Sequence, residues 1–212
     1  MYSGIKDIYN NIKPEVSERI RQFKHLWNNG SDKEIFMELA FCLLTPQSKA
    51  KNAWKAITIL DNSGDLYAAP PEKISSTLNI VRFKNNKAKY LALARDSFYK
   101  REKTYLKNIL DNISNINDKR KWLVENIKGM GYKEASHFLR NTGFVEQTAI
   151  LDRHILKNLK SLHIIKEIPG TITEKKYLEI ESKMKQFSEN IYIPLEYLDF
   201  ILWYKETGVV FK

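Results

Sequence analysis

The chain has 212 residues, 43% of them hydrophobic, which is enough for one large domain or for two small domains that share a cleft. Its 35 basic and 25 acidic residues give a formal net charge of +10, which favours polyanionic partners such as nucleic acid or an anionic membrane face. The single cysteine, Cys42, excludes an internal disulfide framework, a zinc site built on several thiolates and an intrachain four-cysteine iron–sulfur cluster.

Membrane insertion is not expected. No stretch approaches the roughly 20 consecutive apolar residues that span a bilayer. The first residues also lack the apolar core of a signal peptide. We therefore expect a soluble, cytoplasmic protein that is a monomer by default.

Apolar residues repeat at helical spacing along most of the chain. An early apolar face follows a Ser31–Asp32 cap and ends before Pro46, and similar repeats at 135–142, 155–162 and 195–202 predict further helices. Convincing strands are absent, and residues 170–173 form at most a short extended piece. At about three turns per helix, the chain has room for roughly ten helices.

The fold class predicted from this pattern is all-α, with two helical lobes that flank a groove. Many short periodic segments fit two lobes better than one bundle. We expect the N-terminal and C-terminal stretches to complete one lobe and the middle of the chain to form the other. Residues 1–212 are then a single unit of two lobes.

Basic residues concentrate between Arg82 and Lys107, where nine of them face two acidic residues and give a local net charge of +7. Such a run is usually a solvated helix face. Alternatively it contacts phosphates, which would make affinity strongly dependent on salt. The nine are Arg82, Lys84, Lys87, Lys89, Arg95, Lys100, Arg101, Lys103 and Lys107.

Two glycines separated by one residue mark the most informative segment, about 118–143. Asp118 is a plausible N-cap for a first helix, and a second helix starts near Gly131 and ends at Gly143. Gly129 and Gly131 allow a very tight reversal, a pattern typical of a helix–hairpin–helix. Amides at the start of the second helix can then bind a DNA phosphate. An ordinary αα-hairpin without a ligand is the alternative.

Lys133 and Asp152 follow this hairpin. A lysine just inside a helix is normally solvated, and an aspartate before an apolar run is normally an N-cap. Capping and catalysis are compatible for Asp152, because the amides of the following turn would hold its carboxylate ionised and fixed in direction.

The glycine hairpin with this lysine and aspartate resembles the helix–hairpin–helix DNA glycosylases, and most of all the second class of 8-oxoguanine DNA glycosylase/AP lyases. The resemblance extends over most of the chain and includes 43–50, 81–88 and 198–208. It departs at Leu151, where valine is frequent in the superfamily, but the residue stays apolar. The resemblance implies a DNA-repair enzyme that excises 8-oxoguanine from duplex DNA and nicks the abasic site.

The implied catalytic residues are Asp152 and Lys133. A fixed carboxylate at Asp152 would stabilise the electron-poor anomeric carbon in the transition state. The amine of Lys133 would attack that carbon and form an imine, which permits β-elimination. Free lysine titrates near pKa ~10.4, so the interpretation requires burial or positive charge to lower the pKa of Lys133.

The resemblance also implies contacts to a flipped-out nucleotide. Gln47 resembles the family's intercalating residue, which fills the vacated gap; an ordinary surface glutamine is the alternative. Phe83 could wedge beside the opposite base or be a core aromatic, and Arg82 next to it could contact DNA. Trp203 and Asp199 lie four residues apart on one helix face and could line the lesion pocket, although a buried tryptophan is more often part of the core. Lys212 resembles the family's C-terminal lysine, which is associated with distinguishing 8-oxoguanine from guanine.

No cofactor or metal is expected, and the four histidines are interpreted as structural. The expected partner is double-stranded DNA that contains oxidised guanine. Two alternatives remain: a monofunctional glycosylase for another lesion, and a helix–hairpin–helix DNA-binding protein without catalysis. The Lys133 and Asp152 pair argues against the second alternative, because a pure binding module needs neither.

Overall fold

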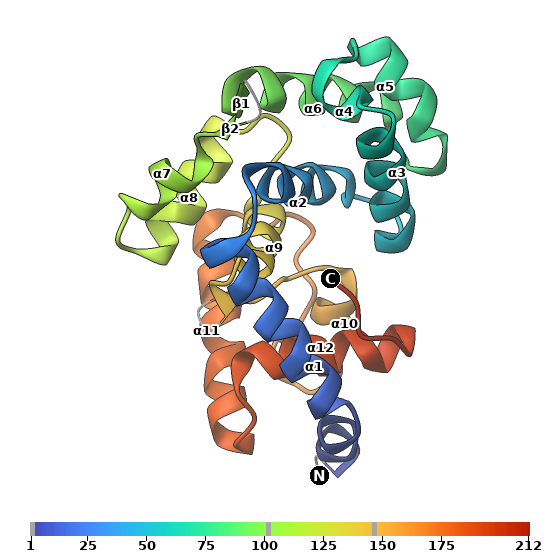
Figure 1. Ribbon diagram of the computed structural model, residues 1–212. Coiled ribbons are helices and arrows are strands. Elements are labelled where there is room, and N and C mark those ends of the chain that lie inside the picture. The colour runs from blue at the N-terminus through green and yellow to red at the C-terminus, as the bar shows by residue number, and fades with distance from the viewer. Residues whose placement is uncertain (1–2, 101–102, 146–147) are drawn as a thin grey trace. The chain divides into compact units, whose positions relative to one another are not determined.

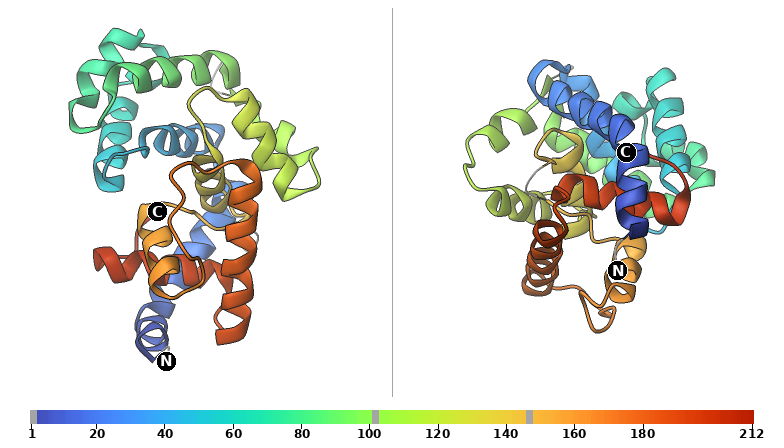
Figure 2. Two further views of the ribbon diagram at one scale, coloured as in Figure 1. Left: turned by 180° about the vertical axis from the view of Figure 1, so that it is seen from behind. Right: turned by 90° about the horizontal axis from the view of Figure 1, so that it is seen from below.

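The computed structural model describes residues 3–100, 103–145 and 148–212, and these are mostly helical (Figures 1 and 2). The all-α prediction is confirmed. In the described part of the chain, the elements are α1 (Ser3–Asn29), α2 (Asp32–Leu44), α3 (Ala50–Asn62), α4 (Asp65–Ala68), α5 (Pro71–Thr77), the 3-10 helix η1 (Leu78–Ile80), α6 (Lys84–Phe98), β1 (Tyr99–Lys100), β2 (Lys103–Thr104), α7 (Leu106–Asp111), α8 (Ile116–Asn126), α9 (Tyr132–Asn141), α10 (Arg153–Ser161), α11 (Glu174–Ile191) and α12 (Leu195–Thr207).

Two strands were not predicted. β1 and β2 pair antiparallel, with Tyr99 opposite Thr104 and Lys100 opposite Lys103. At two residues each they are too short to show an alternating pattern. The extended piece allowed at 170–173 is not a strand, and the side chain of Thr173 instead caps α11 by accepting from the Lys176 amide.

The chain divides into two compact units. One consists of residues 25–138, and the other combines residues 1–24 with residues 139–212. Helices α1 and α9 each contribute residues to both units. No helix in the described ranges is both long and apolar enough to cross a membrane.

Helix α2 is the core of the unit formed by residues 25–138. It begins in a capping box, in which the Ser31 hydroxyl accepts from the Glu34 amide and the Glu34 carboxylate accepts from the Ser31 amide. Ile35, Phe36 and Leu39 are fully buried. The ring of Phe36 stacks on Tyr99 of β1 at 4.8 Å between ring centroids, so the short hairpin closes one side of this core.

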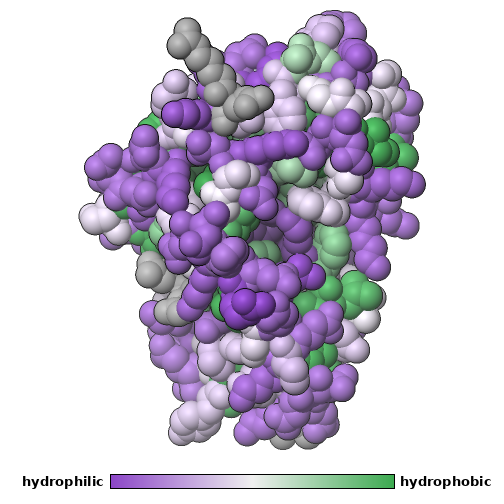
Figure 3. All heavy atoms as spheres, viewed as in Figure 1, coloured by the Kyte–Doolittle hydropathy of each residue, from purple (hydrophilic) through white to green (hydrophobic). Residues whose placement is uncertain are grey.

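The other unit is built around α1, α11 and α12. Val16 of α1, Met184 of α11 and Leu198 of α12 are all fully buried. Phe23 and Phe200 stack with centroids 6.4 Å apart. Hydrophilic residues cover most of the molecular face in Figure 3, and hydrophobic residues form small patches on it.

Candidate active site and DNA-binding turns

The glycine hairpin between α8 and α9 depends on Gly129 more than on Gly131. Gly129 has a φ of +88°, and a Cβ built there would lie 2.3 Å from Cδ2 of Tyr90. Both the backbone angle and the space therefore require glycine. Gly131 has no positive φ, and the nearest atom to its Cβ position would be Glu134 Oε2 at 3.0 Å.

The first helix of this hairpin starts earlier than predicted. Asn115 is the N-cap of α8, and its side chain accepts from the Asn117 amide at 2.7 Å. Asp118, the expected cap, lies in the first turn of α8. Both residue types cap helices well, so the composition of this stretch did not distinguish them.

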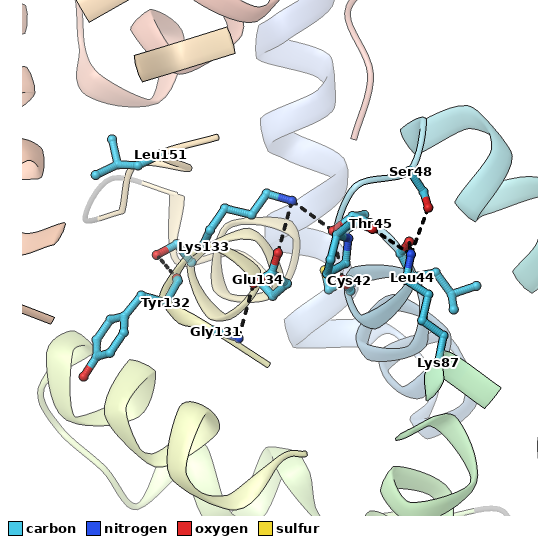
Figure 4. A network of polar contacts seen from close by, with 12 residues as sticks. Cys42, Leu44, Thr45, Ser48, Lys87, Gly131, Tyr132, Lys133, Glu134 and Leu151 are labelled. Carbon is cyan, nitrogen blue, oxygen red and sulfur yellow. Dashed lines mark hydrogen bonds and ion pairs between the residues drawn. The ribbon is translucent and has the colours of Figure 1, made fainter. Parts of the chain in front are cut away.

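The amide of Gly131 is engaged at the start of α9. It donates to Glu134 Oε2 at 3.2 Å, as Figure 4 shows. A phosphate oxygen that docked on this amide would replace the carboxylate. DNA contacts by Gly129 and Gly131 stay a prediction.

Lys133 lies in the first turn of α9, with its side chain 23% exposed. Its Nζ donates to Thr45 Oγ1 at 2.9 Å and lies 3.6 Å from Glu134 Oε1 (Figure 4). Thr45 donates its own hydroxyl proton to the Cys42 carbonyl oxygen at 2.9 Å, which leaves the oxygen lone pairs to face Lys133. The amine is therefore held in one direction.

Lys87 of α6 lies near Lys133 and Glu134 and is buried. This corrects the interpretation of the basic segment as wholly a solvated face or wholly a phosphate-binding one. Its Nζ donates to the Leu44 and Pro46 carbonyl oxygens, both at 2.7 Å, and to Ser48 Oγ at 2.8 Å. Burial and the charge of Lys133 lower the pKa of Lys87 to about 8, while Glu134 opposes this change. Lys87 is neither solvated nor available to phosphates. Arg101 of the same segment lies outside the described residues.

Two exposed turns adjoin this network. Gln47 and Phe83 both adopt left-handed backbone conformations, with φ of 51° and 58°. The Phe83 side chain is 55% exposed, and the Arg82 guanidinium lies 5.7 Å from its ring centroid. These turns carry three of the predicted DNA-contact residues.

Asp152 belongs to the other compact unit and is the N-cap of α10, as its position in the sequence predicted. Its Oδ1 accepts from the Ile155 amide at 2.8 Å. This hydrogen bond fixes the direction of the carboxylate at the N-terminal end of the helix.

The segment 149–151, just before Asp152, is bound by side chains from α11 and α12. Glu181 accepts from the Ala149 amide at 2.8 Å, and the Tyr177 hydroxyl accepts from the Leu151 amide at 3.2 Å. The same hydroxyl donates to the Ala149 carbonyl oxygen at 2.6 Å. Sequence reasoning missed both residues, whose one visible signal is a polar group within an apolar helical repeat.

Asp199 also binds this segment. It is 2% exposed and accepts from Arg140 Nη1 at 2.6 Å and from the Ile150 amide at 3.3 Å. Burial raises its pKa to about 6; the charge of Asp152 adds to this rise and Arg140 opposes it. The i, i+4 spacing with Trp203 did not reveal that both carboxylate oxygens are already bound. Contact between Asp199 and a lesion stays a prediction.

Trp203 and Lys212, both predicted to line the lesion pocket, differ in exposure: the indole nitrogen of Trp203 is buried, whereas Lys212 is partly exposed. The Trp203 ring meets His154 edge-on with centroids 5.2 Å apart, and its Nε1 is buried without a hydrogen-bond partner among the described residues. Lys212 is partly exposed beyond α12.

Within the described ranges, no group of three or more His, Cys, Asp or Glu residues is placed to hold a metal ion.

Comparison with known proteins connects this geometry to a family. A model of the 8-oxoguanine DNA glycosylase family matches residues 16–193. The chain belongs to the 8-oxoguanine DNA glycosylase family. An 8-oxoguanine DNA glycosylase/AP lyase of Fusobacterium nucleatum is 51% identical over 100% of this chain and 97% of its own length. One from Methanocaldococcus jannaschii is 41% identical over 95% and 93%, respectively.

Solved glycosylase structures have the same fold. The 8-oxoguanine DNA glycosylase of Thermotoga maritima has a TM-score of 0.87 at 34% identity and covers 98% of this chain and 96% of its own. The Methanocaldococcus jannaschii 8-oxoguanine glycosylase/lyase, in complex with a 15mer DNA containing 8-oxoguanine, has a TM-score of 0.89 at 37% identity, with 99% and 98% covered. The resemblance seen in the sequence is thereby confirmed.

Proposed function

We propose that this member of the glycosylase family excises 8-oxoguanine from duplex DNA and then cleaves the strand at the abasic site. The observation that carries the residue assignment is that the lysine after the glycine hairpin is anchored by a hydroxyl group and that the next helix in the chain is capped by an aspartate. The activities named for the relatives, and the DNA held in the related structure, support the choice of substrate.

Asp152 stabilises positive charge as the bond between base and sugar breaks. Its carboxylate is fixed by the Ile155 amide. The backbone of residues 149–151, which leads into Asp152, is fixed by hydrogen bonds to Tyr177, Glu181 and Asp199. A charge that needs no rearrangement during the reaction lowers the barrier effectively.

Lys133 supplies the nucleophile. Its amine, in the unprotonated form, bonds to the anomeric carbon, and the base leaves with the electron pair of the glycosidic bond and takes up the proton that the amine nitrogen releases. The ring oxygen then leaves the same carbon with its electron pair and takes a proton from solvent, which gives a protonated imine that acts as an electron sink. Loss of a proton from the adjacent carbon then expels the 3′ phosphate with its C–O electron pair. The Thr45 hydroxyl orients the amine before attack.

The DNA contacts follow from exposure and chemistry. Gln47 and Phe83 enter the duplex from exposed turns, and Arg82 contacts the backbone. Trp203 lines the lesion pocket, where its Nε1–H is free to donate to the base. Asp199 and Lys212 belong to the same pocket, and Gly129 and Gly131 approach a phosphate. Because the substrate is DNA, the place of action is the compartment that holds the chromosome, which is the cytoplasm in a cell without a nucleus.

Borohydride trapping tests the assignment directly. The intact protein should form a covalent adduct with duplex DNA containing 8-oxoguanine, and Lys133→Gln should form none. Lys128→Gln is the matched control, because it removes an exposed lysine on the other side of the hairpin. An adduct that survives Lys133→Gln would overturn the role of Lys133. Preferential cleavage of uracil-containing or alkylated duplexes would overturn the substrate.

A further inference from the structure

The side chain of Lys87 lies in the first turn of α6, and the residue is only 3% exposed, although Asn86 and Lys89 beside it are exposed. An ammonium group has three hydrogen-bond donors. The Leu44 and Pro46 carbonyl oxygens and Ser48 Oγ accept at 2.7, 2.7 and 2.8 Å. All three donors are therefore used within residues 44–48.

These three bonds hold the turn that follows α2. The last carbonyl groups of a helix have no partner within the helix, and Lys87 binds the one at Leu44, where α2 ends. Gln47 lies at the exposed tip of the turn with a φ of 51°. This backbone angle is unfavourable for a residue with a side chain, and it persists when its surroundings impose it.

Ser48 joins this turn to the turn that carries Phe83. Its Oγ accepts from Lys87 Nζ at 2.8 Å and from the Arg82 amide at 3.0 Å. The Arg82 amide immediately precedes Phe83, which also has a left-handed backbone, with a φ of 58°. One hydroxyl group thus connects both exposed turns to the buried ammonium.

We propose that Lys87 is a positioning residue for DNA opening, which fixes the Gln47 turn and the Arg82–Phe83 turn relative to each other so that both enter the duplex together. This inference rests on the proposed function, which places Gln47 and Phe83 against DNA. Opening a duplex costs unstacking energy. If the two turns moved independently, ordering them on binding would add an entropic cost, whereas turns that are already fixed avoid it.

The anchoring of Lys133 is separable from this role. Thr45, which accepts from Lys133 Nζ, belongs to the same turn, but both its amide and its hydroxyl donate to the Cys42 carbonyl oxygen. These bonds remain when Lys87 is replaced. A defect in positioning should therefore affect steps that need an opened duplex more than the chemistry of the amine.

The test compares Lys87→Met with Lys89→Met, which removes an exposed charge two residues further along α6. The substrate is duplex DNA with 2-aminopurine next to 8-oxoguanine, since its fluorescence rises on unstacking. In Lys87→Met we expect a smaller fluorescence rise and roughly tenfold or more slower single-turnover base release. Nicking of single-stranded DNA that already contains an abasic site should stay within about threefold of the intact protein. Lys89→Met should match the intact protein in all three measurements.

Ser48→Ala is the second variant, because it removes the shared hydroxyl and leaves two of the three Lys87 bonds. It should reduce the fluorescence rise in the same direction but less, and it decides the question if Lys87→Met does not fold by circular dichroism. The proposal is overturned if the folded variants match Lys89→Met, or if base release and single-strand nicking fall equally with unchanged fluorescence. Inactivity of the intact protein on 8-oxoguanine would instead refute the proposed function.

Discussion

At the scale of single residues, the two predicted catalytic side chains are held by different means. Lys133 is oriented by one hydroxyl that is itself fixed by a carbonyl group. Asp152 is oriented by one amide in the first turn of its own helix, that of Ile155. Each side chain therefore makes a structural hydrogen bond in addition to its proposed role in the reaction. An informative substitution must keep that hydrogen bond while removing the reactive or charged group.

Asp152→Asn meets this requirement. Asparagine caps helices about as well as aspartate, so the unfolding free energy should change by less than about 1 kcal/mol. DNA binding should persist, whereas single-turnover base release should fall by about 100-fold or more because the negative charge is lost. Thermal unfolding, a binding titration and a glycosylase assay check the three statements. Lost folding would show that capping is the whole role of Asp152.

The protonation of Lys87 predicts how stability depends on pH. Its pKa of about 8 lies below the value in the unfolded chain, so between pH 8 and about 10.5 the unfolded state binds the extra proton. Stability should therefore rise with pH across this range, relative to Lys87→Met, by a few kcal/mol at most. Denaturant unfolding of both proteins at several pH values measures the difference. A difference that falls or stays constant contradicts the burial of a charged Lys87.

At the scale of elements, the hairpin between α8 and α9 combines a fixed requirement with a tolerant one. Gly129 has a positive φ and no room for a Cβ beside Tyr90, whereas Gly131 has an ordinary φ and faces the end of the Glu134 side chain. The two glycines of the motif are equivalent in the sequence, but they are not equivalent in the structure.

Alanine substitutions distinguish them. Gly129→Ala should destabilise the protein by about 2 kcal/mol or more, because it combines an unfavourable backbone angle with a clash against an aromatic ring. Gly131→Ala should cost less than about 1 kcal/mol, since Glu134 can move by a few tenths of an ångström. Chemical denaturation measures both values. Equal losses would mean that the hairpin is less constrained at Gly129 than its geometry indicates.

Several features of these elements could be predicted from the sequence, and others could not. Helical periodicity and the paired glycines predicted the α-helices and the hairpin, because both signals are local. The burial of Lys87 and the binding of segment 149–151 by Tyr177 and Glu181 depend on residues distant in sequence. No spacing rule reaches that far. For the same reason, the sequence alone did not distinguish the buried Lys87 from the exposed lysines of the basic segment.

At the scale of the whole molecule, the positive net charge of +10 predicts salt-dependent DNA binding. Of the three basic residues at the start of the basic segment, Arg82 and Lys84 reach the surface and Lys87 does not. The contribution of this region to phosphate contacts should therefore come from the first two.

Neutralising Arg82 and Lys84 together should make the slope of log affinity against log salt shallower by about 0.9 for each phosphate contact that is lost. The control is Lys166→Gln with Lys185→Gln, which removes the same charge from exposed positions elsewhere. Fluorescence anisotropy at several salt concentrations gives both slopes. If the first pair leaves the slope unchanged, this region is only a solvated helix face.

The bond between the Gly131 amide and Glu134 has a consequence for how this protein searches a genome. A phosphate that accepted a hydrogen bond from that amide would replace the Glu134 carboxylate, so the exchange would gain little free energy. Binding of undamaged DNA through this amide would then be weak, which would favour rapid release.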